Sequence, residues 1–243
     1  MNRLPLSLVL AALGAAAPLA AQSPYPDYVP VSMVQTEEAT FPANLVANGV
    51  KSGAATVAVA IDDRGNLTDY LVTGYTNPAF AEHAIVALKK WKFQAAQIHG
   101  RARDSKADLS FDFQVQGVVV VSLTAGAYDE ILRTQIDAPH AFHACTLAQL
   151  DHIPTPSKIV KPAYDPSVPG SKRGGKVSVE FYIDETGRVR MPSVDLETNE
   201  AYEDLSATAI AAVGQWQFEP PTVKGRPVLV VAHQDFTFQP AAH

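Results

Sequence analysis

An internal repeat occupies most of this 243-residue chain and limits the folds open to it. Two segments carry the same apolar, glycine and aromatic residues in the same order, at an offset of 122 residues that becomes 125 from the helical region onward. So many ordered matches are improbable by chance, and we expect one supersecondary unit to occur twice. The matching positions include Gly53, Val57, Ile61, Gly65, Ala84, Trp91 and Phe93 in the first copy and Gly175, Val179, Ile183, Gly187, Ala209, Trp216 and Phe218 in the second.

Each copy begins with the pattern of a β-hairpin. Residues 176–183 alternate polar and apolar side chains, which is typical of a strand with one buried face. Asp184-Glu-Thr-Gly187 then predicts a tight turn, and residues 188–191 begin the return strand. The equivalent hairpin of the first copy covers residues 56–72. We interpret Asp62 and Asp184 as turn residues rather than acidic ligands.

A helix and a last strand complete each copy. Asn77-Pro78 predicts a helix start, because Asn caps free amides and Pro at the first helical position gives up only a donor that has no partner there. Apolar residues at helical spacing then predict a stripe that faces the sheet: Phe80, Ala84, Leu88 and Trp91 in the first copy, and Tyr202, Leu205, Ala209, Ala212 and Trp216 in the second. We therefore expect both tryptophans in the core rather than at a partner.

The last strands are expected at 107–113 and 228–238. The chain is thus predicted to have an α+β fold of two ββαβ units, each a small antiparallel sheet packed by one helix.

The repeat also divides the chain into segments. We predict a signal peptide or short anchor at 1–21, an N-terminal linker at 22–39, domains at 40–116 and 158–240, and a connector at 117–157. Within the connector, residues 118–123 either extend the preceding strand or form another, residues 128–150 are weakly helical, and the Pro-rich residues 153–157 are typical of a hinge.

The first 21 residues have the order of a secretory signal. A charged start with Arg3 is followed by a Leu/Ala/Val-rich run and by small residues up to Ala21. The alternative is an uncleaved inner-membrane anchor, although Pro5 and Pro18 weaken a spanning helix. We expect export to the periplasm. The single cysteine, Cys145, cannot form an intrachain disulfide, so packing must stabilise the fold.

The second copy combines two motifs of a known family. Residues 175–189 read Gly-x-Val-x-Val-x-Phe-x-Ile-Asp-x-x-Gly-x-Val, and Ala-x-x-Ala-Val-x-x-Trp-x-Phe-x-Pro ends at Pro220. Together these motifs resemble the TonB C-terminal domain, well over residues 162–238 and more loosely over 41–113. Pro162-Ala-Tyr-Asp-Pro166 is similar to the family's Pro-x-Tyr-Pro segment with one residue inserted.

The resemblance implies a non-catalytic periplasmic protein-binding module linked to outer-membrane receptor transport. In the best-known members, a short receptor segment adds as a strand to an exposed sheet edge, where main-chain hydrogen bonds supply affinity. The candidate edge here is 228–233. The implied partner-binding residues are Lys161, Tyr164, Arg226, Val228, Leu229, Val230, Val231 and His233.

This chain differs from a full energy transducer in its N-terminal part. The segment 1–21 contains no His for a proton-coupled helix, and no long Pro-rich linker lies between it and the first copy. We therefore do not expect this chain alone to couple to a membrane motor. The alternative function is an envelope structural or interaction protein that self-associates or contacts the cell wall without energy transduction.

Charge and motifs argue against other classes. With 19 Lys+Arg against 25 Asp+Glu, the formal net charge is -6, and no basic run suggests a nucleic-acid partner. The connector contains a His/Cys/Asp cluster that could suit a metal-dependent or thiol enzyme. Its spacing matches no structural zinc pattern, so we expect no catalytic residue, no metal and no cofactor. The cluster consists of His140, His143, Cys145, Asp151 and His152.

Overall fold

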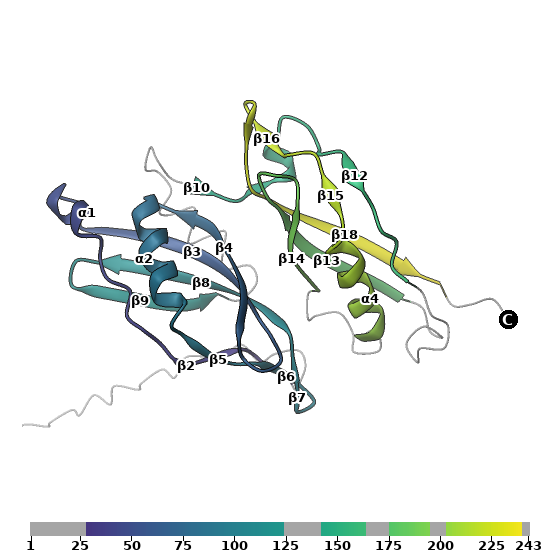
Figure 1. The fold of residues 1–243 in the computed structure, drawn as a ribbon, viewed down its shortest axis with the longest axis horizontal. Helices are drawn as coiled ribbons and strands as arrows, with labels where there is room; N and C mark the ends of the chain where they lie inside the picture. Colours follow the sequence, from purple (N-terminus) through teal and green to yellow (C-terminus); the bar gives the residue numbers. More distant parts are fainter. Residues whose placement is uncertain (1–27, 124–141, 164–174, 195–202, 240–243) are drawn as a thin grey trace, which may run out of the picture.

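In a computed structural model, the described residues are 28–123, 142–163, 175–194 and 203–239. They form two halves that lie side by side along the longest axis, each with one main helix across a sheet (Figure 1). We call residues 28–123 domain 1 and residues 151–239 domain 2. The predicted signal peptide, His140, Tyr164 and Tyr202 lie outside the described residues.

The sheet of domain 1 has five strands in the order β10-β4-β3-β8-β9, and each neighbouring pair is antiparallel. The predicted hairpin is confirmed as β3 and β4, and residues 118–123 form a strand of their own rather than an extension of the preceding one. The strands are β3 (Ser52–Ile61), β4 (Leu67–Tyr75), β8 (Ser105–Gln114), β9 (Gly117–Leu123) and β10 (Phe142–His143).

The sheet of domain 2 has four strands in the order β11-β18-β13-β14. Three of them are antiparallel to their neighbours, but β11 pairs parallel to β18, so the sheet is mixed and not purely antiparallel as predicted. The strands are β11 (Cys145–Thr146), β13 (Gly175–Ile183), β14 (Val189–Val194) and β18 (Val230–Phe238).

Both hairpins turn at a glycine in the left-handed conformation. Gly65 has a φ of 81° and Gly187 a φ of 83°. A Cβ at either position would overlap a backbone carbonyl oxygen, that of Phe93 or of Phe218 respectively. Glycine is therefore required at both turns.

The turn aspartates are confirmed as structural residues. One carboxylate oxygen of Asp62, and likewise of Asp184, accepts the backbone N–H groups two and four residues further along the chain. The hydrogen bond from the Asn66 side chain has the largest effect on the pKa of Asp62 and, together with the one from the Asn66 backbone N–H, holds it below its ordinary value.

Helix α2 (Pro78–Leu88) begins where the sequence predicts. The Oδ1 atom of Asn77 accepts a hydrogen bond from the Ala79 backbone N–H at 3.0 Å. The apolar stripe of α2 packs on one face of the domain 1 sheet. Helix α4 (Glu203–Val213) packs in the same way on the sheet of domain 2. Among the described residues, the other helices are the short α1 (Ala43–Ala47) and the 3-10 turn η1 (Leu147–Gln149).

The two tryptophans occupy matching places in the two cores, as predicted. Trp91 is 5% exposed and Trp216 9%. Each indole N–H donates to the backbone of a segment that precedes the repeat unit: Trp91 to the Glu37 carbonyl at 2.8 Å and Trp216 to the Val160 carbonyl at 2.7 Å. These bonds tie the leading segment of each domain to its core.

Short strands add to the predicted units. The segment expected as a linker, 22–39, pairs with domain 1 from Tyr28 onward, and the Pro-rich segment expected as a hinge pairs with domain 2. In domain 1 these strands are β1 (Tyr28–Val29), β2 (Ser32–Gln35), β5 (Lys92–Gln94), β6 (Ala96–Ile98) and β7 (Arg101–Arg103). In domain 2 they are β12 (Pro156–Lys158), β15 (Gln217–Phe218), β16 (Thr222–Val223) and β17 (Arg226–Pro227).

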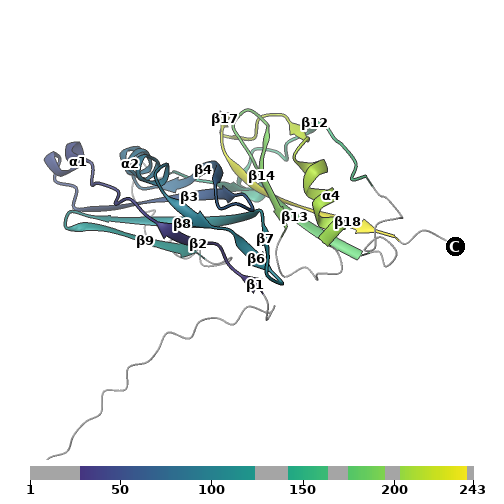
Figure 2. The same cartoon turned by 60° about the horizontal axis from the view of Figure 1, so that its bottom comes forward.

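The two sheets meet through the faces that point away from their helices. Figure 2 shows β13 and β14 of domain 2 next to domain 1. Ala58 of domain 1 forms one buried apolar cluster with Tyr182, Met191 and Leu229 of domain 2. Their chain neighbours Val57, Val59 and Phe181 face the helices instead, because side chains alternate along a strand.

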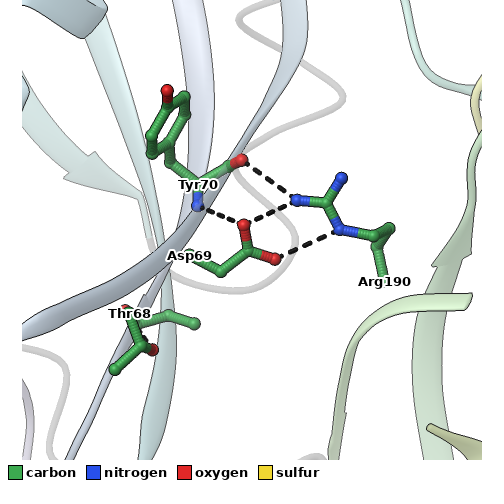
Figure 3. A network of polar contacts seen from close by, with 5 residues as sticks. Thr68, Asp69, Tyr70 and Arg190 are labelled. Atoms are coloured by element: carbon green, nitrogen blue, oxygen red, sulfur yellow. Dashed lines mark hydrogen bonds and ion pairs between the residues drawn. The ribbon is translucent and has the colours of Figure 1, made fainter.

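Ion pairs flank this cluster. The guanidinium of Arg190 contacts the Asp69 carboxylate through Nη2 at 2.6 Å and through Nε at 3.2 Å, and it also reaches the Tyr70 carbonyl at 3.4 Å (Figure 3). Lys106 pairs with Glu180, and its Nζ lies 5.1 Å from the ring centroid of Tyr182. Each domain thus contributes one acid and one base to the interface.

Candidate protein-interaction site

The last strand of domain 2 is paired unequally on its two sides. β13 covers one side along the whole strand, from Ile183 opposite Val230 to Gly175 opposite Phe238. On the other side, β11 pairs only with Val230 and Val231. From Ala232 to Thr237, no other strand of the described residues pairs with this side. We call residues 232–237 the open edge.

The direction of the backbone groups along the open edge follows from one hydrogen bond. The Cys145 N–H donates to the Leu229 carbonyl at 2.8 Å, so the backbone groups of Leu229 point toward the β11 side. Alternate residues of a strand point the same way, which directs the N–H and C=O groups of His233, Asp235 and Thr237 to the open edge. Such a row of groups is a template for another strand.

The two faces beside the open edge differ in chemistry. On the helix side, Phe236 lies 5.8 Å from Trp216 and 6.4 Å from Phe238, measured between ring centroids. On the other side, Asp235 pairs with Lys176 at 2.7 Å. The hydrogen bond from the Lys176 side chain has the largest effect on the pKa of Asp235 and, together with the one from the Ser178 side chain, holds it below its ordinary value.

An added strand would therefore place alternate side chains against an aromatic face and a charged face. His233 extends the charged face: its Nε2 is 3.7 Å from a carboxylate oxygen of Glu180 on the neighbouring strand. This arrangement favours a partner segment that alternates apolar and polar residues.

The strand of domain 1 that is equivalent to β18 is β8, the last strand of the first repeat unit. It pairs with β3 on one side and with β9 on the other, and the pairing to β9 extends from Asp108 to Gln114. Of the two repeat units, only domain 2 leaves most of its last strand unpaired within the described part of the chain.

The predicted site residues divide into three groups. His233 lies on the open edge, and Lys161 and Arg226 are exposed elsewhere in domain 2. The edge predicted at 228–233 needs correction, because Val228 and Leu229 precede β18 and β11 already pairs with Val230 and Val231. Leu229 and Val230 are also almost fully buried, at 1% and 0% exposure.

Asp235 and Thr237, which lie on the open edge, are not among the site residues predicted from the sequence. The alternation of residues up to Phe238 predicts the length of the strand, but only the pairing with β11 shows which half of the strand lacks a second partner.

The described members of the connector cluster, His143, Cys145, Asp151 and His152, do not form a metal site. The carboxylate of Asp151 accepts the backbone N–H groups of Lys224 and Gly225 at 2.7 and 2.8 Å, which fixes the β16–β17 turn. His152 pairs with Glu219 at 2.9 Å. Across the described ranges, no three His, Cys, Asp or Glu side chains gather as metal ligands would. Residues 142–150, expected to be weakly helical, form β10, β11 and η1 instead.

These features define a tandem protein of two small α+β domains, and within the described residues most of β18 in domain 2 has no strand partner on one side, whereas the equivalent β8 in domain 1 is paired on both. A family model, the C-terminal domain of the Gram-negative bacterial TonB protein, matches residues 37–115 and 161–240. The chain therefore belongs to this family and contains two copies of its domain, and the family is one of periplasmic protein-interaction modules. No curated protein matches the chain. Within the part of the chain that the structure covers, no helix has the length and apolar character needed to cross a membrane.

Proposed function

We propose that this protein is a non-catalytic periplasmic binding module of outer-membrane receptor transport, and that domain 2 binds an extended partner segment by strand addition. The partner pairs with the backbone groups of His233, Asp235 and Thr237. The secretory pattern of residues 1–21 supports a periplasmic location, and the family supports an outer-membrane receptor as the partner.

The open edge of β18 is the observation that carries this proposal. Within the described residues, the six residues 232–237 have a strand partner on one side only, whereas the equivalent strand of domain 1 is paired on both sides. Strand addition derives its affinity from main-chain hydrogen bonds and needs no charged pocket. The modest net charge of -6 is compatible with this mode of recognition.

A pair of variants at one residue tests the proposal. His233→Pro removes an N–H that points to the open edge and leaves the ladder to β13 intact, because proline is tolerated where the N–H faces outward. His233→Ala removes the same imidazole and keeps the N–H. Binding of a synthetic segment from a receptor plug is measured by isothermal titration calorimetry with the purified chain.

We expect His233→Ala to bind almost as the parent does, and His233→Pro to bind at least about fivefold more weakly, since one net hydrogen bond corresponds to about 1 kcal/mol. Equal loss of affinity in both variants would assign the contact to the imidazole and contradict strand addition. Binding of wall fragments, with no binding of receptor segments, would favour the envelope structural alternative.

A further inference from the structure

One short segment of the connector pairs with the sheets of both domains. Phe142 and His143 form β10 on the edge of β4 in domain 1, and the Ala144 N–H donates to the Thr73 carbonyl at 2.7 Å. The next residue, Cys145, begins β11 on the edge of β18 in domain 2. Five consecutive residues therefore complete one sheet and then continue into the other.

Side chains hold this segment at both ends. The ring of Phe142 stacks on Tyr75 with centroids 5.1 Å apart. In domain 2, Cys145, Leu147 and Leu150 are partly buried against the helix-side core. Burial also raises the pKa of the Cys145 thiol.

The segment leaves β18 after only two residue pairs. Thr146 pairs with Val231, and the chain then turns into η1, whose first residue is Leu147. A capping box between Thr146 and Gln149 fixes this turn, in which the Gln149 Oε1 accepts the Thr146 N–H at 2.7 Å. The turn therefore stands at the point where the open edge begins.

We propose that β11 is an internal competitor of the partner strand: an incoming segment displaces Cys145 and Thr146 and pairs with β18 from Val230 onward. This inference rests on the proposed function of the open edge. The exchange gives up the two residue pairs of β11, and it lengthens the site from residues 232–237 to residues 230–237. Because β11 is parallel to β18, the segment that replaces it most directly also runs parallel.

The pattern of the internal strand describes the partner that fits. Cys145 and Leu147 face the core of domain 2, whereas Thr146 between them is exposed. A matching segment would carry small or medium apolar residues at alternate positions and polar residues between them. Because β10 and β11 are separated by one residue, release of β11 would also weaken the pairing of β10 with β4, so binding at domain 2 would destabilise an edge of the domain 1 sheet.

Cys145 is the only cysteine of the chain and reports directly on the exchange. The probe is a synthetic peptide with the chain's own residues 142–150 that carries Cys145→Ser. The rate of alkylation of Cys145 in the full protein is measured against peptide concentration up to the millimolar range, because a tethered segment has an effective concentration of that order. We expect a saturable rise of at least about fivefold, the factor that corresponds to one net hydrogen bond.

A pair of variants sharpens this experiment. Leu147→Ala removes a partly buried anchor of the internal strand, and Ala148→Ser alters an exposed neighbour in the same turn as a control. We expect faster basal alkylation in Leu147→Ala and about fivefold tighter binding of the peptide and of a receptor plug segment, because a weaker internal competitor releases the edge. Thermal unfolding followed by circular dichroism checks that both variants are folded.

The outcomes separate the two proposals. If the plug segment binds in the manner that depends on the His233 N–H, but Cys145 reactivity stays constant and Leu147→Ala has no effect, then the exchange is wrong and the proposed function stands. If neither the parent nor Leu147→Ala binds the plug segment, the proposed function is contradicted and the exchange fails with it. Plug binding that appears only in Leu147→Ala supports the exchange.

Discussion

Tyr182 is expected to contribute more to the docking of the two domains than the ion pair between Arg190 and Asp69. Its side chain is 4% exposed and lies on the face of β13 opposite to the helix, where it meets Ala58 of domain 1. An aromatic side chain buries about 150–250 Å2, which at about 25 cal/mol per Å2 gives about 4–6 kcal/mol. Met191 and Leu229 of its own domain cover part of the ring. We therefore assign about half, about 2–3 kcal/mol, to the contact with domain 1.

The ion pair between Arg190 and Asp69 is expected to contribute much less. Its side chains are 32% and 39% exposed, so solvent screens the attraction, and such pairs are worth about 0.2–1 kcal/mol. Tyr182→Ala should thus lower the free energy of unfolding by about 4–6 kcal/mol, of which about 2–3 kcal/mol is the contact with domain 1, and Arg190→Ala by less than about 1 kcal/mol. Tyr182→Phe keeps the ring and is the matched control.

The position of the tryptophans provides the assay. Each domain has one tryptophan in its core, so Trp91→Phe and Trp216→Phe each leave a fluorescent reporter of a single domain. With the interface intact, urea unfolding should give coincident transitions in these two proteins. With Tyr182→Ala added, the transitions should separate, because the domains no longer stabilise each other. Arg190→Ala destabilising the protein as much as Tyr182→Ala would refute this reasoning.

Two further perturbations test local parts of the structure. Burial, assisted by Glu180 and opposed by Lys106, raises the pKa of Asp108, whose Oδ1 has no hydrogen-bond partner among the described residues. Stability from such a group is present below the ordinary aspartate pKa and is lost as the pH rises through the raised value. Asp108→Asn should therefore raise stability by about 1 kcal/mol at pH 7, a gain that should vanish near pH 4 in urea titrations. Gly187→Ala should destabilise domain 2 clearly more than Gly225→Ala does. Both glycines have positive φ, but only at Gly187 would a Cβ overlap a backbone oxygen. Thermal unfolding of the two variants measures the difference. Equal melting temperatures would contradict the close approach of Phe218.

Local signals in the sequence were sufficient for the centre of each domain. The hairpin turns at Gly65 and Gly187, the Asn77 cap and the buried stripe through Trp91 depend on neighbours within a few residues or on helical periodicity. These features leave a pattern that can be read without tertiary contacts.

The candidate site depends on contacts between residues that are distant in the sequence, and such contacts produce little recognisable pattern in the local sequence. Strands β10 and β11 are two residues each, and they form because Tyr75 and Val230 offer sheet edges that are distant in the sequence. Their weak helical pattern was overridden by this tertiary pairing. The same is true of Tyr28 onward, which pairs with strands that follow helix α2. Which half of β18 stays open therefore could not be predicted from the sequence.

Amide hydrogen exchange in the complex with a receptor plug segment tests strand addition at domain 2 most directly. The N–H groups of His233, Asp235 and Thr237 point to the open edge, so each should exchange slowly only when the segment is bound. Gln234 and Phe236 direct their N–H groups to β13 and should be protected with or without it. Binding that leaves the exchange of His233, Asp235 and Thr237 unchanged would contradict the account.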